Sequence, residues 1–200
     1  MGAHGSKSKK GLKKKYTKSS LESLAKMTHF TPEQIETLYI HFKSISNSDS
    51  SDNKISVKEF EQALGLPSTA FTRRIFSAFD TDGSAEIEFD EFILGLSAMS
   101  PQATIEEKAQ FCFGVYDIDG NGSIEKEELK QILTFSLSGN ESVHLSEAQI
   151  NAVVDSTFKQ MDSDGNGGIS FDEFLAAANK NPAILSCVNL KVDDIFNKNK

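Results

Sequence analysis

The sequence has no long hydrophobic run and only two cysteines among its 200 residues. No apolar stretch approaches the roughly 20 residues that a membrane-spanning helix needs, and the N-terminus lacks the apolar core of about 7–15 residues of a secretory signal. We therefore expect the protein to stay inside the cell. Cys112 and Cys187 are too few and too far apart in sequence for a disulfide framework or a zinc site. Reduced and mostly buried thiols are expected, and they indicate nothing catalytic.

Acidic residues are absent from the first 20 residues, which carry seven lysines. The other 180 residues hold 14 basic and 29 acidic residues, so a tail of charge +7 precedes a body of charge −15. An acidic body argues against nucleic acid as the main partner and suits the binding of hard cations. The lysines of the tail are Lys7, Lys9, Lys10, Lys13, Lys14, Lys15 and Lys18.

The body of the chain repeats one unit four times. Each unit has aromatic or aliphatic residues four and one positions before a polar loop, an isoleucine at the loop's eighth position and an acid at its end. This repeat predicts an all-α protein in two paired lobes, each with a short two-stranded β-ribbon between its loops. We expect a disordered basic tail at 1–20, an N-terminal lobe at 21–100, a C-terminal lobe at 101–181 and an apolar segment at 182–200.

Helix boundaries are marked by capping boxes, in which a Ser or Thr is followed three residues later by Glu or Gln. The boxes are Thr31–Gln34, Ser56–Glu59, Thr104–Glu107, Ser146–Gln149 and Ser170–Glu173. Asn181 and Pro182 should end the last helix of the fourth unit. Beyond them, Ile184, Leu185, Val188, Leu190, Val192, Ile195 and Phe196 are apolar. That segment either packs on the fourth unit or takes part in a groove for a partner.

The third and fourth loops match the calcium pattern D-x-[DN]-x-[DN]-G-x₅-E at every constrained position. Calcium takes about 6–8 hard oxygen ligands; alternate loop positions supply them, with a carbonyl at position seven and two oxygens from the final glutamate. Glycine at position six allows a positive φ at little cost. The expected ligands of these two strong calcium sites are Asp117, Asp119, Asn121, Ser123 and Glu128, and Asp162, Asp164, Asn166, Gly168 and Glu173.

The second loop keeps its ligands but has Ala85 where glycine is expected. Holding a β-carbon at positive φ costs about 1–2 kcal/mol, which weakens binding about 5- to 30-fold. We expect a third, weaker calcium site. Its ligands are Asp80, Asp82, Ser84, Glu86 and Glu91.

The first loop departs furthest from the pattern. Counting back from Ile55 starts the loop at Ser48, whereas the helix phase of Phe42 and Ile45 gives a 14-residue loop, Ser46–Glu59. Such a loop offers carbonyl oxygens and its final glutamate to calcium, or it serves only as a structural partner of the second loop. Both interpretations remain open.

These residues resemble the calcineurin B branch of EF-hand proteins and, within it, the calcineurin B-like calcium sensors known from plants. The resemblance is carried by F-K-S-I-S at 42–46 with its 14-residue loop, R-I-F-S-A-F-D at 74–80, A-T-I-E-E-K at 103–108 and N-K-N-P-A-I-L at 179–185. It implies a non-catalytic sensor whose lobes form an apolar cleft that grips an amphipathic helix of a serine/threonine protein kinase. Two features of that family are missing: Ala3 stands where a second acylated Cys is common, and no Pro-Phe-rich tail follows Phe196.

The first six residues, Met1 to Ser6, fit the pattern for N-myristoylation of Gly2. One myristoyl chain binds membranes only marginally, with a constant near 10⁴ M⁻¹, so a second signal is needed. The lysines supply it, each worth up to about 1 kcal/mol against anionic lipid. We expect a cytoplasmic protein peripherally attached to membranes; the alternative is a disordered, solubilising tail.

Three functions compete: a calcium sensor that docks on a kinase, a regulatory subunit of a calcineurin-type phosphatase, and a calcium buffer. The resemblance favours the kinase sensor, because calcineurin B itself has a 12-residue first loop. A buffer has little use for a lipidated tail or unequal loops. An enzyme is not expected, because the four histidines do not cluster with Ser, Cys or Asp in a way that suggests a nucleophile or base.

Overall fold

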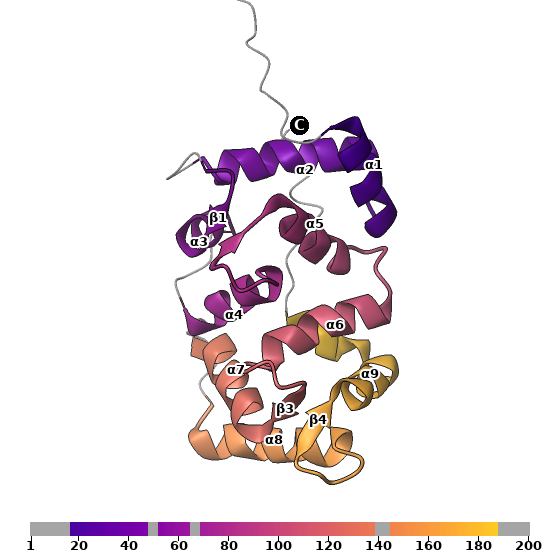
Figure 1. Ribbon diagram of the computed structural model, residues 1–200. Coiled ribbons are helices and arrows are strands. Elements are labelled where there is room, and N and C mark those ends of the chain that lie inside the picture. The colour runs from indigo at the N-terminus through magenta and orange to yellow at the C-terminus, as the bar shows by residue number, and fades with distance from the viewer. Residues whose placement is uncertain (1–16, 48–51, 65–68, 139–144, 188–200) are drawn as a thin grey trace, which may run out of the picture.

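The computed structural model describes residues 17–47, 52–64, 69–138 and 145–187, and in them it is mostly helical (Figure 1). The predicted lipidation site at Gly2, the lysines before residue 17, Ser48 and the apolar residues from 188 onward lie outside the described residues. Among the described residues, no helix has the length and apolar content that crossing a membrane requires.

The N-terminal lobe is formed by five helices and one β-ribbon in the described part of the chain. The helices are α1 (Lys18–Met27), α2 (Pro32–Ile45), α3 (Val57–Leu64), α4 (Ala70–Phe79) and α5 (Phe89–Ala98), and the strands are β1 (Ile55–Ser56) and β2 (Glu86–Ile87). Helix α1 begins inside the segment predicted to be disordered, which ran to residue 20. The Thr17 hydroxyl caps it by accepting a hydrogen bond from the Ser20 N–H at 3.2 Å.

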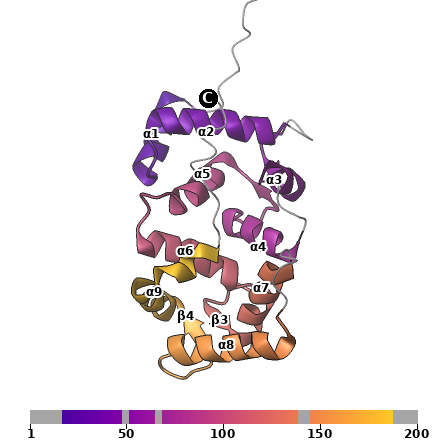
Figure 2. The ribbon, with the colours of Figure 1, turned by 180° about the vertical axis from the view of Figure 1, so that it is seen from behind.

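The C-terminal lobe, lower in Figure 1, repeats the two helix–loop–helix units and the ribbon but, among its described residues, has no counterpart of α1. Its elements are α6 (Ile105–Tyr116), β3 (Ser123–Glu125), α7 (Lys126–Ser138), α8 (Glu147–Met161), β4 (Gly168–Ser170) and α9 (Phe171–Lys180), followed by the 3₁₀ helix η1 (Pro182–Cys187). As predicted, α9 ends before Asn181 and Pro182. Seen from behind, α9 lies beside α6 with η1 next to both (Figure 2).

Short-range sequence signals position the loops. All five predicted capping boxes form; at the third loop's entering helix, for example, Glu107 N donates to Thr104 Oγ1 at 3.1 Å while Glu107 accepts from the Thr104 N–H at 2.7 Å. The eighth residue of each loop pairs with that of its neighbour across an antiparallel ribbon. The pairs are Ile55 with Ile87 and Ile124 with Ile169. These features confirm an all-α fold of four EF-hand units in two paired lobes.

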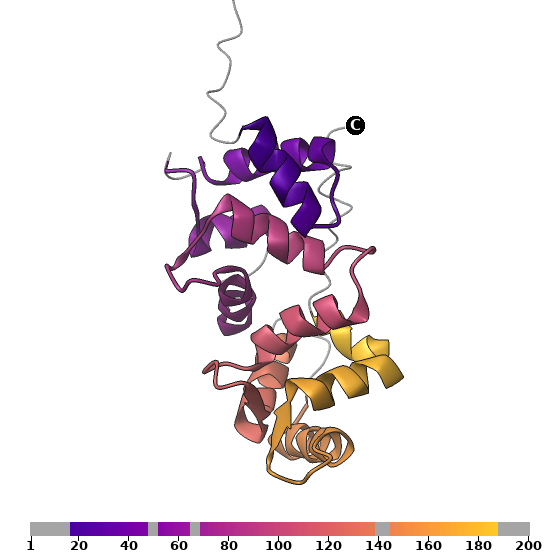
Figure 3. The ribbon, with the colours of Figure 1, turned by 45° about the vertical axis from the view of Figure 1, so that its right-hand side comes forward.

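The two lobes share a core along α6. The buried cluster of the N-terminal lobe also contains Phe111 and Val115 of α6 and Ile132 of α7. The ring of Phe79, at the end of α4, packs edge-to-face on that of Phe111 with centroids 5.3 Å apart. The view in Figure 3 shows α6 running along the border between the lobes. The third unit is therefore packed against the N-terminal lobe, whereas the fourth lies away from it.

Candidate metal centres

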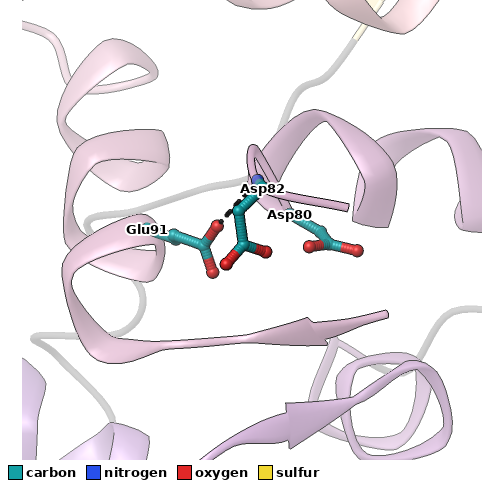
Figure 4. Close-up of side chains that lie close together, drawn as sticks. All are labelled: Asp80, Asp82 and Glu91. Atoms are coloured by element: carbon teal, nitrogen blue, oxygen red, sulfur yellow. Dashed lines mark hydrogen bonds between the residues drawn. The ribbon is translucent and has the colours of Figure 1, made fainter. Parts of the chain in front are cut away.

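Three groups of carboxylates gather in the described part of the chain, one in each of the second, third and fourth loops. In each group the ligand oxygens lie within 4.8 Å of one another. The first aspartate ends the entering helix, the second lies in the loop and the glutamate lies in the first turn of the exiting helix. Figure 4 shows this arrangement for the second loop, with the three carboxylates between the end of α4 and the start of α5. The groups are Asp80, Asp82 and Glu91; Asp117, Asp119 and Glu128; and Asp162, Asp164 and Glu173.

Backbone N–H groups hold the carboxylates of the third loop inward. Asp117 accepts hydrogen bonds from Asn121 N at 3.1 Å and Gly122 N at 3.0 Å. Glu128 bridges the two halves of the loop: Oε1 accepts from Ile118 N at 2.6 Å, while Oε2 accepts from Glu125 N at 2.9 Å. Asn121 Oδ1 accepts from Ser123 N at 2.8 Å, which leaves the Ser123 carbonyl at position seven as the remaining predicted ligand.

The fourth loop repeats these contacts. Asp162 accepts from Gly167 N at 3.1 Å, and Glu173 Oε1 accepts from Ser163 N at 2.7 Å. Asn166, at position five, accepts from Gly168 N at 2.9 Å. The side chains predicted as ligands are thus held as in the third loop.

The second loop has the same geometry despite its alanine. Ala85 N donates to Asp80 at 2.9 Å, as Gly122 N does to Asp117, and Glu91 Oε1 accepts from Thr81 N at 2.9 Å. The φ angle of Ala85 is 65°, as the loop pattern predicts for position six. Ser84 donates its hydroxyl to the Glu86 carbonyl at 2.9 Å, so positions five and seven lie side by side. The loop keeps its shape at the cost of a strained residue.

The first loop is built like the others in its second half. Helix α2 ends at Ile45 and Ser46 caps it, which agrees with the 14-residue count from Ser46 to Glu59. Asn53, the sixth residue in the alternative count from Ser48, has a φ of 67°, and Glu59 accepts from Ser56 N at 2.9 Å. Lys43 of α2 donates its ammonium group to the side-chain oxygen of Asn53. Positions 48–51, on which the prediction of either a calcium loop or a structural loop depends, lie outside the described residues.

The closing glutamates of the third and fourth loops differ in burial and in pKa. Burial raises the pKa of Glu128 above its ordinary value, because a charged carboxylate is disfavoured away from water. The pKa of Glu173 falls instead to about 2, because the Ser170 N–H and then the Ser163 hydroxyl donate to it and stabilise the charged form. Two glutamates at the same loop position therefore hold protons with different strengths.

The donor set fits a hard divalent cation. Every side chain in the three clusters offers carboxylate oxygen, which Ca²⁺ and Mg²⁺ prefer over the nitrogen and sulfur donors that zinc takes. The carboxylates converge although they repel one another, and loop N–H groups hold them there. Seven or so oxygens on a flexible loop suit calcium better than the strict octahedron that magnesium demands.

Comparison with known proteins agrees with this geometry. Residues 106–178 match the family model described as an EF-hand domain pair. Calcineurin B of Naegleria gruberi is 37% identical over 154 residues, which cover 77% of this chain and 84% of that protein. Calcineurin B type 2 of Homo sapiens is 38% identical over 149 residues, covering 74% of this chain and 84% of the relative. Calcineurin B of Candida glabrata is 35% identical over 157 residues, which cover 78% of this chain and 86% of that protein.

The chain belongs to the calcineurin B-like family of EF-hand proteins. Calcium binding through EF-hands follows for this calcineurin B-like protein from the family and from the acidic clusters together.

Two contacts between the lobes of this calcineurin B-like protein were not predicted from sequence. His29 Nε2 lies 2.9 and 3.0 Å from the two carboxylate oxygens of Glu107, at the start of α6. Arg74 of α4 contacts the other end of α6, where the third loop begins. Arg74 belongs to a segment that carried the resemblance, yet nothing in its spacing indicates the loop it contacts, which lies more than 40 residues away.

Proposed function

We propose that the protein is a calcium sensor that docks an amphipathic helix of a partner enzyme and catalyses no reaction itself. One observation carries the proposal. A cavity of about 270 Å³ lies between α7, α8, α9 and η1, and Ile124 and Ile169, which pair the third and fourth loops, line it. The same two residues thus belong to the calcium loops and to an apolar surface. Val153, another lining residue, is 42% exposed, so the cavity reaches the surface.

Residues of the third loop connect calcium binding to the shape of this cavity. Bound calcium supplies a double positive charge that the ligand oxygens share. Asp117 lies at the end of α6 and Glu128 at the start of α7, so drawing their carboxylates together changes the angle between these helices. Leu129 follows Glu128 directly and lines the cavity with Leu133, one turn further along α7. A change at the loop therefore changes the width of the apolar site.

A serine/threonine protein kinase is the partner that we propose first. The 14-residue first loop supports this choice, because the plant sensors that the sequence resembles share it. The second candidate is a phosphatase catalytic subunit, and the similarity to proteins that carry the name calcineurin B supports that one. Both partners would present an amphipathic helix, whose apolar side chains suit a cavity lined by Leu, Ile, Met and Phe.

We also propose that the protein acts in the cytoplasm at a membrane surface. The N-myristoylation pattern at Gly2 and the lysines after it support this localisation. Both features lie outside the described residues, apart from Lys18. The expected lipid is anionic, since the tail is strongly basic.

Affinity capture from native cells, with calcium and with a chelator, tests the docking proposal. We expect a kinase among the proteins retained only with calcium; a phosphatase catalytic subunit in its place would favour the second candidate. Val153→Glu, at the cavity, should abolish the capture. Ile40→Glu, at an N-terminal-lobe residue that is 66% exposed, serves as the matched control and should leave it intact. Equal capture by both variants would contradict docking at the cavity.

Membrane attachment has its own test. Protein made with N-myristoyltransferase should float with vesicles containing phosphatidylserine, and Gly2→Ala should remain in the soluble fraction. Neutral phosphatidylcholine vesicles should retain little of either protein, because the lysines then lack anionic lipid. Equal flotation of the parent and Gly2→Ala would overturn the lipidation proposal.

A further inference from the structure

The side chain of Arg74 reaches from the N-terminal lobe to the start of the third loop. Arg74 is half-buried on α4 and donates four hydrogen bonds to backbone oxygens of the C-terminal lobe. Nη2 donates to Gly114 O at 2.8 Å and to Asp117 O at 2.9 Å. Longer bonds run from Nε to Val115 O at 3.4 Å and from Nη1 to Ile118 O at 3.3 Å. One side chain thus contacts the last turn of α6 and the first two residues of the loop.

The chemistry of these acceptors explains why an arginine fits here. Carbonyl oxygens at the C-terminus of a helix have no partner within the helix, and the helix dipole is negative there. A guanidinium presents five N–H donors in a rigid plane, whereas a lysine ammonium is a compact charge with three donors. The carboxylate of Asp117 meanwhile keeps its bonds to Asn121 N and Gly122 N. Arg74 therefore holds the loop from outside and leaves the ligand oxygens directed inward.

Helix α4 connects this contact to the second loop. Its last residue, Phe79, precedes the ligand Asp80 and packs on Phe111 in the middle of α6. Arg74 lies in the same helix, six residues before Asp80. Any tilt of α4 that accompanies ion binding in the second loop therefore displaces the guanidinium relative to the third loop.

We propose that Arg74 is a positioning residue of the third calcium loop and couples that loop to the second. With α4 as it stands in this structure, the guanidinium fixes the Asp117 and Ile118 carbonyls and pre-organises the loop for its ion. The coupling crosses between the lobes and adds to the β3–β4 ribbon, which joins the third loop to the fourth. The proposal rests on calcium binding by the loops and does not depend on the partner helix.

A double-mutant cycle tests the coupling. Calcium titrations are followed through the amide NMR signal of Gly122, which reports the third loop because its N–H donates to Asp117. Glu91→Gln disables the second loop. In the parent background it should lower the calcium affinity at Gly122 by at least about fivefold, the lower end of measured allosteric couplings. In an Arg74→Met background the same change should alter that affinity by less than about twofold, as for independent sites.

Control variants separate positioning from general stability. Arg73→Met removes the same charge from an exposed neighbour on α4 and should preserve the full effect of Glu91→Gln. Arg74→Lys keeps the positive charge but loses the planar guanidinium with its five N–H donors, so the coupling should fall as it does in Arg74→Met. The same Glu91→Gln effect with and without Arg74 would overturn the proposal, and so would full coupling in Arg74→Lys. The titrations contain no partner, so a failure of the docking proposal would leave them unchanged.

Discussion

The third and fourth loops match the same calcium pattern at every constrained position, but the fold places them in different surroundings. Asp117 and Glu128 are only 9% and 7% exposed, because the third loop faces the N-terminal lobe and Arg74. The fourth loop lies at the far end of the C-terminal lobe (Figure 1), and its Glu173 is partly exposed. The pattern therefore predicts which atoms would bind the ion, while the packing of the lobes sets the charge environment of those atoms.

The difference appears in the closing glutamates. In the third loop burial raises the pKa of Glu128, so its charge is disfavoured until a cation compensates it. In the fourth loop hydrogen bonds lower the pKa of Glu173 to about 2, so its charge is stabilised before any ion binds. Two loops with the same predicted ligands can thus differ, before calcium binds, in how readily the closing glutamate is charged.

Removing either glutamate should have the largest effect. Glu128→Gln and Glu173→Gln should each weaken calcium binding in their own loop by more than about 100-fold, since second-shell changes at metal sites already cost about 10- to 100-fold. Calcium titrations followed through the amide NMR signals of Gly122 and Gly167 measure the affinity of each loop.

The stability of the calcium-free variants should separate the two loops. Glu173→Gln should lower the melting temperature, because it removes a stabilised carboxylate, whereas Glu128→Gln should leave it unchanged or raise it, because it removes a buried charge. Equal destabilisation by the two substitutions would break the comparison.

Position six should give effects of intermediate size that are alike in both loops. Gly122→Ala and Gly167→Ala should weaken their own loops about 5- to 30-fold, because φ is 86° and 93° and a β-carbon there costs about 1–2 kcal/mol. A β-carbon at either glycine would contact nothing within 4 Å, so backbone strain alone is measured. Ala85→Gly should tighten the second loop by the same factor.

The control for these substitutions is Gly114→Ala in α6. A β-carbon there also has nothing within 4 Å, and the residue lies in regular helix. The calcium affinity of the third loop should stay within about twofold of the parent. Unchanged affinity after Gly122→Ala would refute the strain argument.

Lowering the pH should give the smallest change in calcium affinity, and it should affect the third loop before the fourth. Ion binding requires ionised carboxylates, so the affinity of the third loop should be halved, a change of about twofold, at the pH that equals the raised pKa of Glu128. The fourth loop should keep its glutamate ionised at that pH, because the pKa of Glu173 is about 2. The amide NMR signals of Gly122 and Gly167, recorded at fixed calcium while the pH is lowered from 7, report which loop releases its ion first. Release from both loops at the same pH would contradict this prediction.

The calcium-free stability should follow the same signs. Glu173 has a depressed pKa, so the stability it contributes is present above its unfolded pKa of about 4.5 and is lost as the pH falls toward 2. Glu128 has a raised pKa, so its contribution is present below the unfolded value and is lost as the pH rises through the folded one.

Much of the fold was predictable because its causes are local. Each capping box joins residues three apart, and the second, third and fourth loops each hold their predicted ligands within 12 residues. The left-handed conformation of Ala85 follows from its place in the loop, and the isoleucine pairs follow from the eighth position. The start of α1 was missed by a few residues, because the lysine run hid the cap at Thr17.

Contacts between the lobes were not predictable by the same means. Arg74 and Asp117 are 43 residues apart, and His29 and Glu107 are 78 apart. Whether they meet depends on which face of α6 packs on the N-terminal lobe, and the apolar residues of that helix point to both cores. Phe111 enters one core while its neighbour Cys112 enters the other.

The sequence by itself determined the four units, the positions of the predicted calcium ligands and the strained position six, because these depend on bonds and turns within a dozen residues. Only the tertiary structure decided that the first and last carboxylates of the third loop are buried beside Arg74, while those of the fourth loop are partly exposed. Burial and the field of distant charges arise when the lobes pack, and two loops of the same pattern acquire different proton affinities from that packing.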